Sequence, residues 1–157
     1  MEFKLLGMCA ILFGGIACGV SLNKRAEHEL REAESWGELF RYITEKITAF
    51  GMPVNEIIAE CDSDLLERCG LLGGASLSFK ERVLSREIRY KRSEKIIRSF
   101  AESFGKIDRA EQIKDCEYYT RLMENHRQTL EGKLQNQKKI NLTLSVSVAL
   151  AIIIILI

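Results

Sequence analysis

Two uncharged segments, one near each end of the sequence, constrain most strongly what this chain can form. Residues 5–22, LLGMCAILFGGIACGVSL, and residues 140–157, INLTLSVSVALAIIIILI, contain no Asp, Glu, Lys or Arg. A helix of this length measures about 27 Å and nearly matches the ~30 Å hydrocarbon core of a bilayer. We therefore predict an N-terminal transmembrane anchor at 1–23, a charged middle domain at 24–139 and a C-terminal transmembrane helix at 140–157.

The second uncharged segment also carries a pattern typical of a strand. Residues 140–148, INLTLSVSV, alternate apolar and polar side chains, which is the period of a half-buried strand. A lone strand in lipid would leave its backbone N–H and C=O groups without partners, at several kcal/mol each. We therefore predict that this segment is a helix.

Positive charges flank both segments on the side of the middle domain. Lys24 and Arg25 follow the first segment, and Lys138 and Lys139 precede the second. An excess of Lys and Arg marks the cytoplasmic side of a membrane span. The sequence thus predicts a cell-membrane protein with two spans, its middle domain in the cytosol and both termini outside.

The first segment allows an alternative. The sequence GIAC at 15–18 resembles a lipoprotein cleavage box, so the alternative is an exported or membrane-attached lipoprotein processed at Cys18, with a helical binding domain. Gly15 stands where a large aliphatic residue is expected, and the basic residues after the segment oppose export. In the anchored form, Gly7, Gly15 and Gly19 would offer a surface for close packing against another helix, from this chain or from a second subunit.

Apolar residues in the middle domain recur at helical spacing. Between residues 26 and 50 they are Ala26, Leu30, Ala33, Phe40, Ile43, Ile47 and Phe50. The turn GMPVNE at 51–56 ends that helix and begins a second one, and a third helix over 63–74 is stopped by Gly73 and Gly74. A further helix starts at Ser78 and continues to Phe104, with a weak apolar register between Ile88 and Ile96. We find no convincing strand and predict an all-α antiparallel bundle.

A capping signal precedes the last helix. Gly105 breaks the chain, and DRAE at 108–111 forms a capping box in which Asp108 accepts a backbone hydrogen bond and Glu111 reaches back. The helix then carries apolar residues from Ile113 to Leu134, and nothing interrupts it before Lys138. We predict one long helix from about residue 109 into the final span.

No catalytic, cofactor-binding or metal-binding constellation is apparent. The sequence lacks GxxxxGK[ST], GxSxG and HExxH motifs, and neither His28 nor His126 has a metal-ligand partner four residues on. The five cysteines form no CxxC pair, which favours reduced thiols that are buried or face lipid. Net charge is +1, which gives no indication of nucleic-acid binding. An acidic cluster is formed by Glu56, Glu60, Asp62, Asp64 and Glu67. It lacks the spacing of a calcium loop, so we predict that it is a solvated helix face.

One basic segment is a candidate contact surface. Residues 85–98, SREIRYKRSEKIIR, hold six cations: Arg86, Arg89, Lys91, Arg92, Lys95 and Arg98. One interpretation is an exposed helix face with ion pairs such as Glu87–Lys91 and Glu94–Arg98. The other is contact with anionic lipid or with an acidic partner.

Several sequence stretches together resemble the stage III sporulation protein AB family. They are KLLG at 4–7, FRYITEKI at 40–47, GMPVNEI at 51–57 and FGKIDRAEQ at 104–112, in which Gly105, Asp108 and Gln112 fit the family's pattern. Two features depart from it: Ile107 precedes the aspartate where Ser or Thr is more usual, and the last span lacks glycine.

The resemblance implies a fold and a role. The middle domain would be similar to the helical domain of type II secretion and type IV pilus inner-membrane platform proteins. The protein would be a non-enzymatic part of a sporulation channel between mother cell and forespore, with the domain in the mother-cell cytosol. Its implied partners are a secretion-type ATPase and the channel's other membrane subunits.

Overall fold

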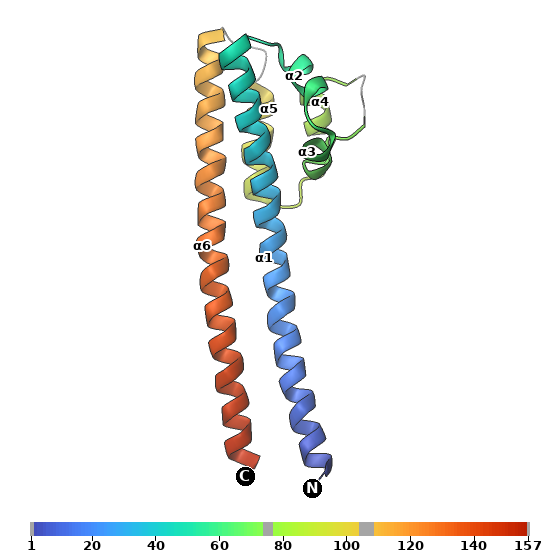
Figure 1. Cartoon of the computed structure of the whole chain (residues 1–157), viewed down its shortest axis with the longest axis vertical. Coiled ribbons are helices and arrows are strands. Elements are labelled where there is room, and N and C mark those ends of the chain that lie inside the picture. The colour runs from blue at the N-terminus through green and yellow to red at the C-terminus, as the bar shows by residue number, and fades with distance from the viewer. Residues whose placement is uncertain (1, 74–76, 104–108, 157) are drawn as a thin grey trace. The chain divides into compact units, whose positions relative to one another are not determined.

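The computed structural model describes residues 2–73, 77–103 and 109–156. In these residues it contains six helices and no strand, which confirms the all-α prediction (Figure 1). The helices are α1 (Glu2–Phe50), α2 (Val54–Glu60), α3 (Ser63–Arg68), α4 (Phe79–Leu84), α5 (Lys91–Ser103) and α6 (Arg109–Leu156). The chain divides into two compact units, one formed by Leu30–Gln128 and the other by Met1–Glu29 with Thr129–Ile157.

Within the unit Leu30–Gln128, α1 and α6 lie side by side in opposite directions (Figure 1). The hydroxyl groups of Thr44 and Thr120 are 3.1 Å apart. Further along, a carboxylate oxygen of Glu34 lies 3.9 Å from a guanidinium nitrogen of Arg127. From the first contact to the second, the residue number decreases on α1 and increases on α6. The two helices therefore form an antiparallel pair.

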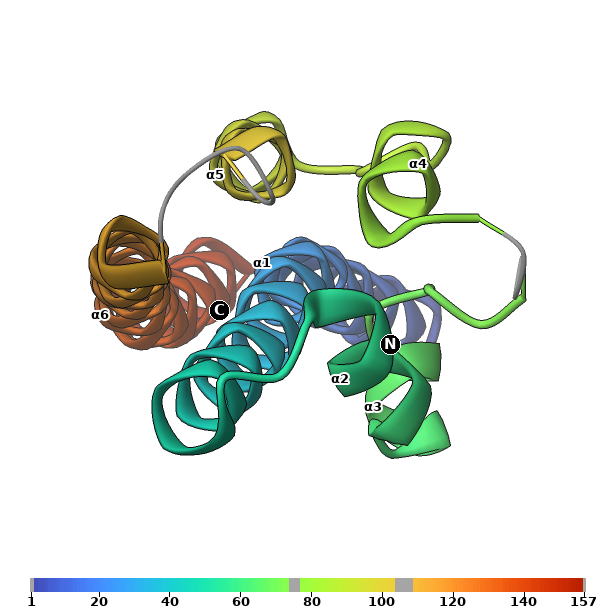
Figure 2. The ribbon, with the colours of Figure 1, turned by 90° about the horizontal axis from the view of Figure 1, so that it is seen from above.

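Helix α5 packs on this pair through one aromatic side chain. The ring centroid of Phe100 is 4.0 Å from that of Phe40 on α1 and 5.7 Å from that of Tyr119 on α6. It is also 6.1 Å from the ring centroid of Phe79 on α4. Phe100 is fully buried, and Figure 2 shows α5 beside both long helices. The core of this unit is therefore centred where α1, α4, α5 and α6 meet.

The predicted apolar stripe on α1 is confirmed from Ala33 to Ile47, whereas Ala26 and Leu30 are only half-buried. Ala33, Phe40, Ile43 and Ile47 are all buried. Phe50 is 70% exposed, so its assignment to the buried stripe was wrong. It is the last residue of α1, and the ammonium group of Lys46 lies 5.5 Å from its ring centroid, so the ring packs against a neighbouring cation instead of the core.

Helix α3 ends earlier than the predicted stop at Gly73–Gly74. Gly70 has φ +64°, the left-handed conformation that favours glycine. Its N–H donates to the carbonyl oxygen of Glu67 at 2.7 Å, and the Leu71 N–H donates to that of Leu66 at 2.7 Å. These two bonds make a Schellman motif, which stops the helix after Arg68. Gly74 lies outside the described residues.

The predicted single helix from Ser78 to Phe104 is two helices, α4 and α5. Ser78 and Glu81 form a capping box that starts α4. Residues 85–90 are not helical, yet Ile88 and Tyr90 are buried. The two side chains are two residues apart and both are buried, which a helix does not allow on one face. This explains why the apolar residues of this part of the sequence do not follow helical spacing. Phe104 lies outside the described residues.

Helix α6 begins at Arg109 and continues unbroken to Leu156. This confirms the prediction of one long helix and the choice of helix over strand for residues 140–148. Glu111 is exposed in its first turn, where a carboxylate complements the helix dipole, and Gln112 is half-buried. The other two residues of the predicted cap, Gly105 and Asp108, lie outside the described residues.

The second unit joins the outer parts of α1 and α6. The side-chain amide of Asn141 donates to the Asn23 side-chain oxygen at 2.9 Å, and Lys138 pairs with Glu27 at 2.8 Å. Over the residues that the structure describes, no helix has a stretch both long and apolar enough to cross a membrane. The side chains of the first predicted span, including Gly7, Gly15, Gly19 and Cys18, lie outside that description, as do several of the second.

Candidate functional site

Two of the six cations in the basic segment belong to the scaffold. Arg98 pairs with Glu94 at 2.9 Å, which confirms the predicted i,i+4 pair. It also donates to the backbone carbonyl oxygens of Leu84 and Arg86, each at 3.1 Å. Arg98 therefore ties the end of α4, the linker and α5 together.

Arg86 is directed toward the α3 terminus. Its guanidinium lies so close to Gly70 that a Cβ atom at Gly70 would overlap with it. Glycine at this position thus allows the left-handed backbone conformation and also leaves room for the Arg86 guanidinium. The buried Nη1 of Arg86 has no hydrogen-bond partner among the described residues, so Arg86 packs against this terminus without the polar partners that Arg98 has.

The other four cations, Arg89, Lys91, Arg92 and Lys95, are exposed, and we call them the cation quartet. Within the described residues none of the four makes a hydrogen bond or an ion pair. The predicted Glu87–Lys91 pair was wrong. Glu87 lies in the non-helical linker, so the spacing of four residues does not place it one helical turn from Lys91.

A buried contact holds the quartet in place. Ser93 is fully buried in the first turn of α5, and its hydroxyl lies 3.2 Å from Nε2 of His126 on α6. Lys91 and Lys95, two residues before and after Ser93, lie on the opposite face of the helix. Lys91, Arg92 and Lys95 are therefore presented outward from a fixed part of α5, and Arg89 lies in the linker just before this helix.

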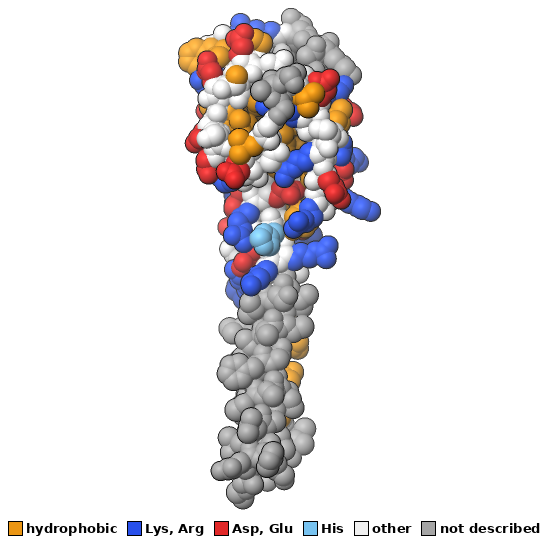
Figure 3. All heavy atoms as spheres, turned by 90° about the vertical axis from the view of Figure 1, so that its right-hand side faces the viewer, with side chains coloured by type: hydrophobic (Ala, Val, Ile, Leu, Met, Phe, Trp, Pro, Cys, Tyr) orange, Lys and Arg blue, Asp and Glu red, His pale blue; other side chains and the backbone are white. Residues whose placement is uncertain are grey.

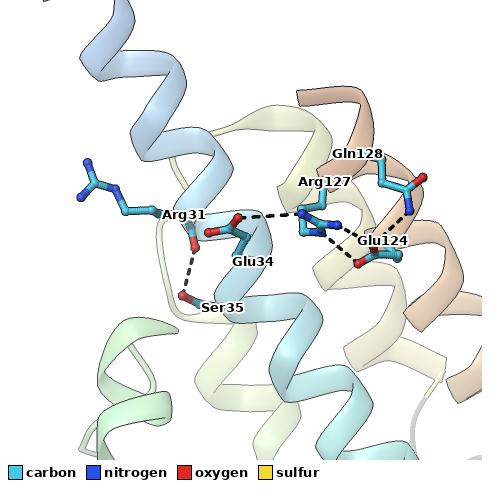
Figure 4. A network of polar contacts seen from close by, with 6 residues as sticks. All are labelled: Arg31, Glu34, Ser35, Glu124, Arg127 and Gln128. Atoms are coloured by element: carbon cyan, nitrogen blue, oxygen red, sulfur yellow. Dashed lines mark hydrogen bonds and ion pairs between the residues drawn. The ribbon is translucent and has the colours of Figure 1, made fainter. Parts of the chain in front are cut away.

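A second polar cluster lies along the seam between α1 and α6 (Figure 4). Arg127 binds both carboxylate oxygens of Glu124, at 2.8 and 3.0 Å, and Gln128 donates to the same carboxylate at 3.1 Å. The hydrogen bond from Arg127 lowers the pKa of the Glu124 carboxyl, and the bond from Gln128 adds to this effect. A hollow of about 340 Å³ beside them is lined by Gly37, Arg41, Thr120, Glu124 and Arg127. The Arg127 guanidinium in this hollow already has an internal carboxylate partner.

The predicted solvated acidic face is confirmed. Glu56, Glu60, Asp62, Asp64 and Glu67 are all exposed. Three of them have local structural partners: Asp62 accepts from the Asp64 N–H at 3.1 Å, Asp64 pairs with Arg68 at 3.0 Å and Glu60 pairs with Lys46 at 3.6 Å. Charges of both signs are interspersed on the face shown in Figure 3. Among the described residues, no cluster of His, Cys, Asp and Glu could hold a metal ion.

The described cysteines are free and buried, as predicted: Cys61, Cys69 and Cys116. Burial raises the pKa of the Cys116 thiol to about 12, with Asp115 and Glu117 contributing in the same direction. Burial likewise raises the pKa of Cys69 well above its usual range. Neither thiol has the low pKa of a nucleophilic cysteine.

These thiols are expected to resist alkylation in the folded protein. At about pH 8, a thiol with a pKa near 12 holds about a thousandfold less thiolate than an ordinary cysteine. A maleimide should therefore label Cys116 only after denaturation, as measured by peptide mass spectrometry. Rapid labelling of Cys116 in the native protein would contradict this assignment.

Sequence reasoning missed three side-chain arrangements. The capping box at Ser78–Glu81 had a readable S-x-x-E signature. The Glu124–Arg127 pair had i,i+3 spacing, which is also detectable on a helix. The Ser93–His126 contact joins two helices far apart in the sequence and left no local signal.

Comparison with known proteins places the chain in a family. No curated protein and no solved structure matches it. The family described as stage III sporulation protein AB matches residues 4–157, which is nearly the whole sequence. This match agrees with the resemblance in KLLG, FRYITEKI, GMPVNEI and FGKIDRAEQ. The chain belongs to the stage III sporulation protein AB family.

Proposed function

We propose that this protein is a non-enzymatic platform subunit of a sporulation channel between mother cell and forespore. In this proposal it resides in the cell membrane of an endospore-forming bacterium, with two spans and both termini outside. The helical unit lies in the mother-cell cytosol, where it docks a secretion-type ATPase and other channel subunits. The protein can act in this way as a single copy or as a homo-oligomer.

One observation carries this proposal. Helices α1 and α6 are unbroken between the helical unit and the two uncharged segments. A helix that continues from the docking unit into a membrane span joins the two without a separate linker segment. The basic residues Lys24, Arg25, Lys138 and Lys139 support a cytosolic location for the unit. Family membership supports the sporulation role.

A topology map tests the membrane arrangement. We expect Glu2→Cys to react with a membrane-impermeant maleimide in intact protoplasts that express the full chain. Lys114→Cys, on an exposed position of α6, should react only after permeabilisation, because the helical unit would lie inside. Labelling of Lys114→Cys in intact protoplasts would exclude the proposed orientation. A mature chain that begins at Cys18 by mass spectrometry would instead establish the lipoprotein alternative.

ATPase docking is tested separately. An affinity-tagged full chain would be solubilised in detergent from membranes of sporulating cells, and the secretion-type ATPase would be measured in the purified material. Its recovery with the chain, but not with an unrelated tagged membrane protein, is the expected result. Its consistent absence would contradict the platform role.

A further inference from the structure

The cation quartet is poorly explained by folding alone. Lys91 and Arg92 lie in the first turn of α5, where positive charge opposes the helix dipole. Lys91 and Lys95 are like charges at i,i+4, an arrangement that destabilises a helix. Glu94 lies in the same turn but pairs with Arg98, and within the described residues no carboxylate forms an ion pair with Lys91, Arg92 or Lys95. Arg98, in contrast, donates to three internal acceptors.

We propose that the cation quartet is a docking surface for an acidic helical face of a cytosolic protein partner. This inference rests on the proposed platform function, and the partner tested is the secretion-type ATPase. Carboxylates one turn apart on a partner helix match the one-turn separation of Lys91 and Lys95. Arg89 and Arg92 add forked donors that bind carboxylates in bidentate geometry.

The mixed charge of the segment favours a protein over a lipid surface. Glu87 is exposed in the same linker as Arg89, and an anionic bilayer would repel it. Against a protein, interspersed charges of both signs fix register and exclude wrong partners. Basic clusters that bind lipid lie either beside a membrane span or on an amphipathic helix. The first arrangement does not apply to the quartet, because long stretches of sequence separate it from both uncharged segments.

The surface is also preorganised. The Ser93–His126 contact anchors the first turn of α5 on α6. The two carbonyl bonds made by Arg98 hold the linker that carries Arg89. A rigid surface loses less conformational entropy on binding than a mobile one. The quartet can therefore bind without first ordering its backbone.

Charge reversal in the full-length chain tests this inference. The variant is Lys91→Glu with Lys95→Glu, and the readout is the amount of ATPase recovered with the tagged chain from solubilised membranes of sporulating cells. Like charges placed opposite each other should lower recovery by about tenfold or more. The matched control is Lys114→Glu with Arg121→Glu, two exposed cations of α6, and it should recover ATPase as the native chain does. Lys91→Arg with Lys95→Arg keeps the charge and should also retain recovery.

The outcomes separate this inference from the proposed function. If the native chain recovers ATPase and the charge-reversed chain recovers the same amount, the quartet is not the docking surface, while the platform role stands. Failure of the native chain itself contradicts the platform role. A photo-crosslinking residue in place of Lys95 gives an independent reading that does not depend on the stability of the reversed variant. An adduct with the ATPase supports the inference, whereas an adduct with anionic phospholipid alone overturns it.

Discussion

Replacing Phe100 by alanine is expected to destabilise the helical unit strongly, by about 3–5 kcal/mol. Phe100 is fully buried and contacts aromatic rings from three other helices, those of Phe40, Phe79 and Tyr119. Truncation removes the apolar surface of the ring and leaves a cavity that these neighbours can fill only in part. Because α5 meets α1, α4 and α6 through this side chain, the loss affects the whole unit.

The measurement is the thermal unfolding midpoint of the detergent-solubilised full chain, followed by fluorescence of Trp36. Trp36 is the only tryptophan in the sequence and is fully buried, with its ring 6.0 Å from that of Phe40. The midpoint should fall by more than about 10 °C. Phe50→Ala is the matched control, because Phe50 is 70% exposed and its loss should have little effect. Equal midpoints for the two variants would show that Phe100 does not hold the core together.

Helical periodicity predicted much of this core because it is a local property. Phe40, Ile43 and Ile47 recur on one face of a helix, and a face that is apolar over several turns must be covered by something. The same pattern failed at Phe50. Periodicity identifies a face but carries no information about where the covering helices end.

Helix ends were harder to predict where two signals competed. Both Gly70 and Gly73 have positive φ, and each is a plausible helix stop by sequence. The choice depends on tertiary packing: Leu71 is buried, and its N–H reaches the carbonyl oxygen of Leu66 only if the helix ends at Arg68. Burial of a residue after the helix thus selects the earlier glycine.

Composition located the candidate site but could not divide its cations into internal and exposed ones. The sequence places six cations within residues 86–98, and nothing local distinguishes the exposed Lys95 from the internally bonded Arg98. The partners of Arg98 include carbonyl oxygens of Leu84 and Arg86, which border or lie in a linker whose non-helical course was not predicted. Which cations are left exposed for a partner therefore depends on the course of that linker, which has no local sequence signal.

Arg98→Ala is expected to lower the stability of the helical unit by about 2–3 kcal/mol, because it removes hydrogen bonds made by a charged group. The guanidinium joins Glu94 to the carbonyl oxygens of Leu84 and Arg86, and alanine leaves those acceptors without their donor. The conservative variant Arg98→Lys lacks the planar fork of the guanidinium and should restore only part of the loss. The readout is again the Trp36 unfolding midpoint of the full chain.

Lys95→Ala is the contrasting variant, because Lys95 is exposed and is a like-charge neighbour of Lys91. Its removal should leave stability unchanged or slightly raised. Under the docking inference, Lys95→Ala should still weaken ATPase recovery. A loss of stability in Arg98→Ala but not in Lys95→Ala would show that Arg98 supports the fold and Lys95 does not. If Arg98→Ala had the same unfolding midpoint as the native chain, the three contacts of Arg98 would contribute nothing measurable to stability. Arg98 would then have to be counted with the quartet as a surface cation.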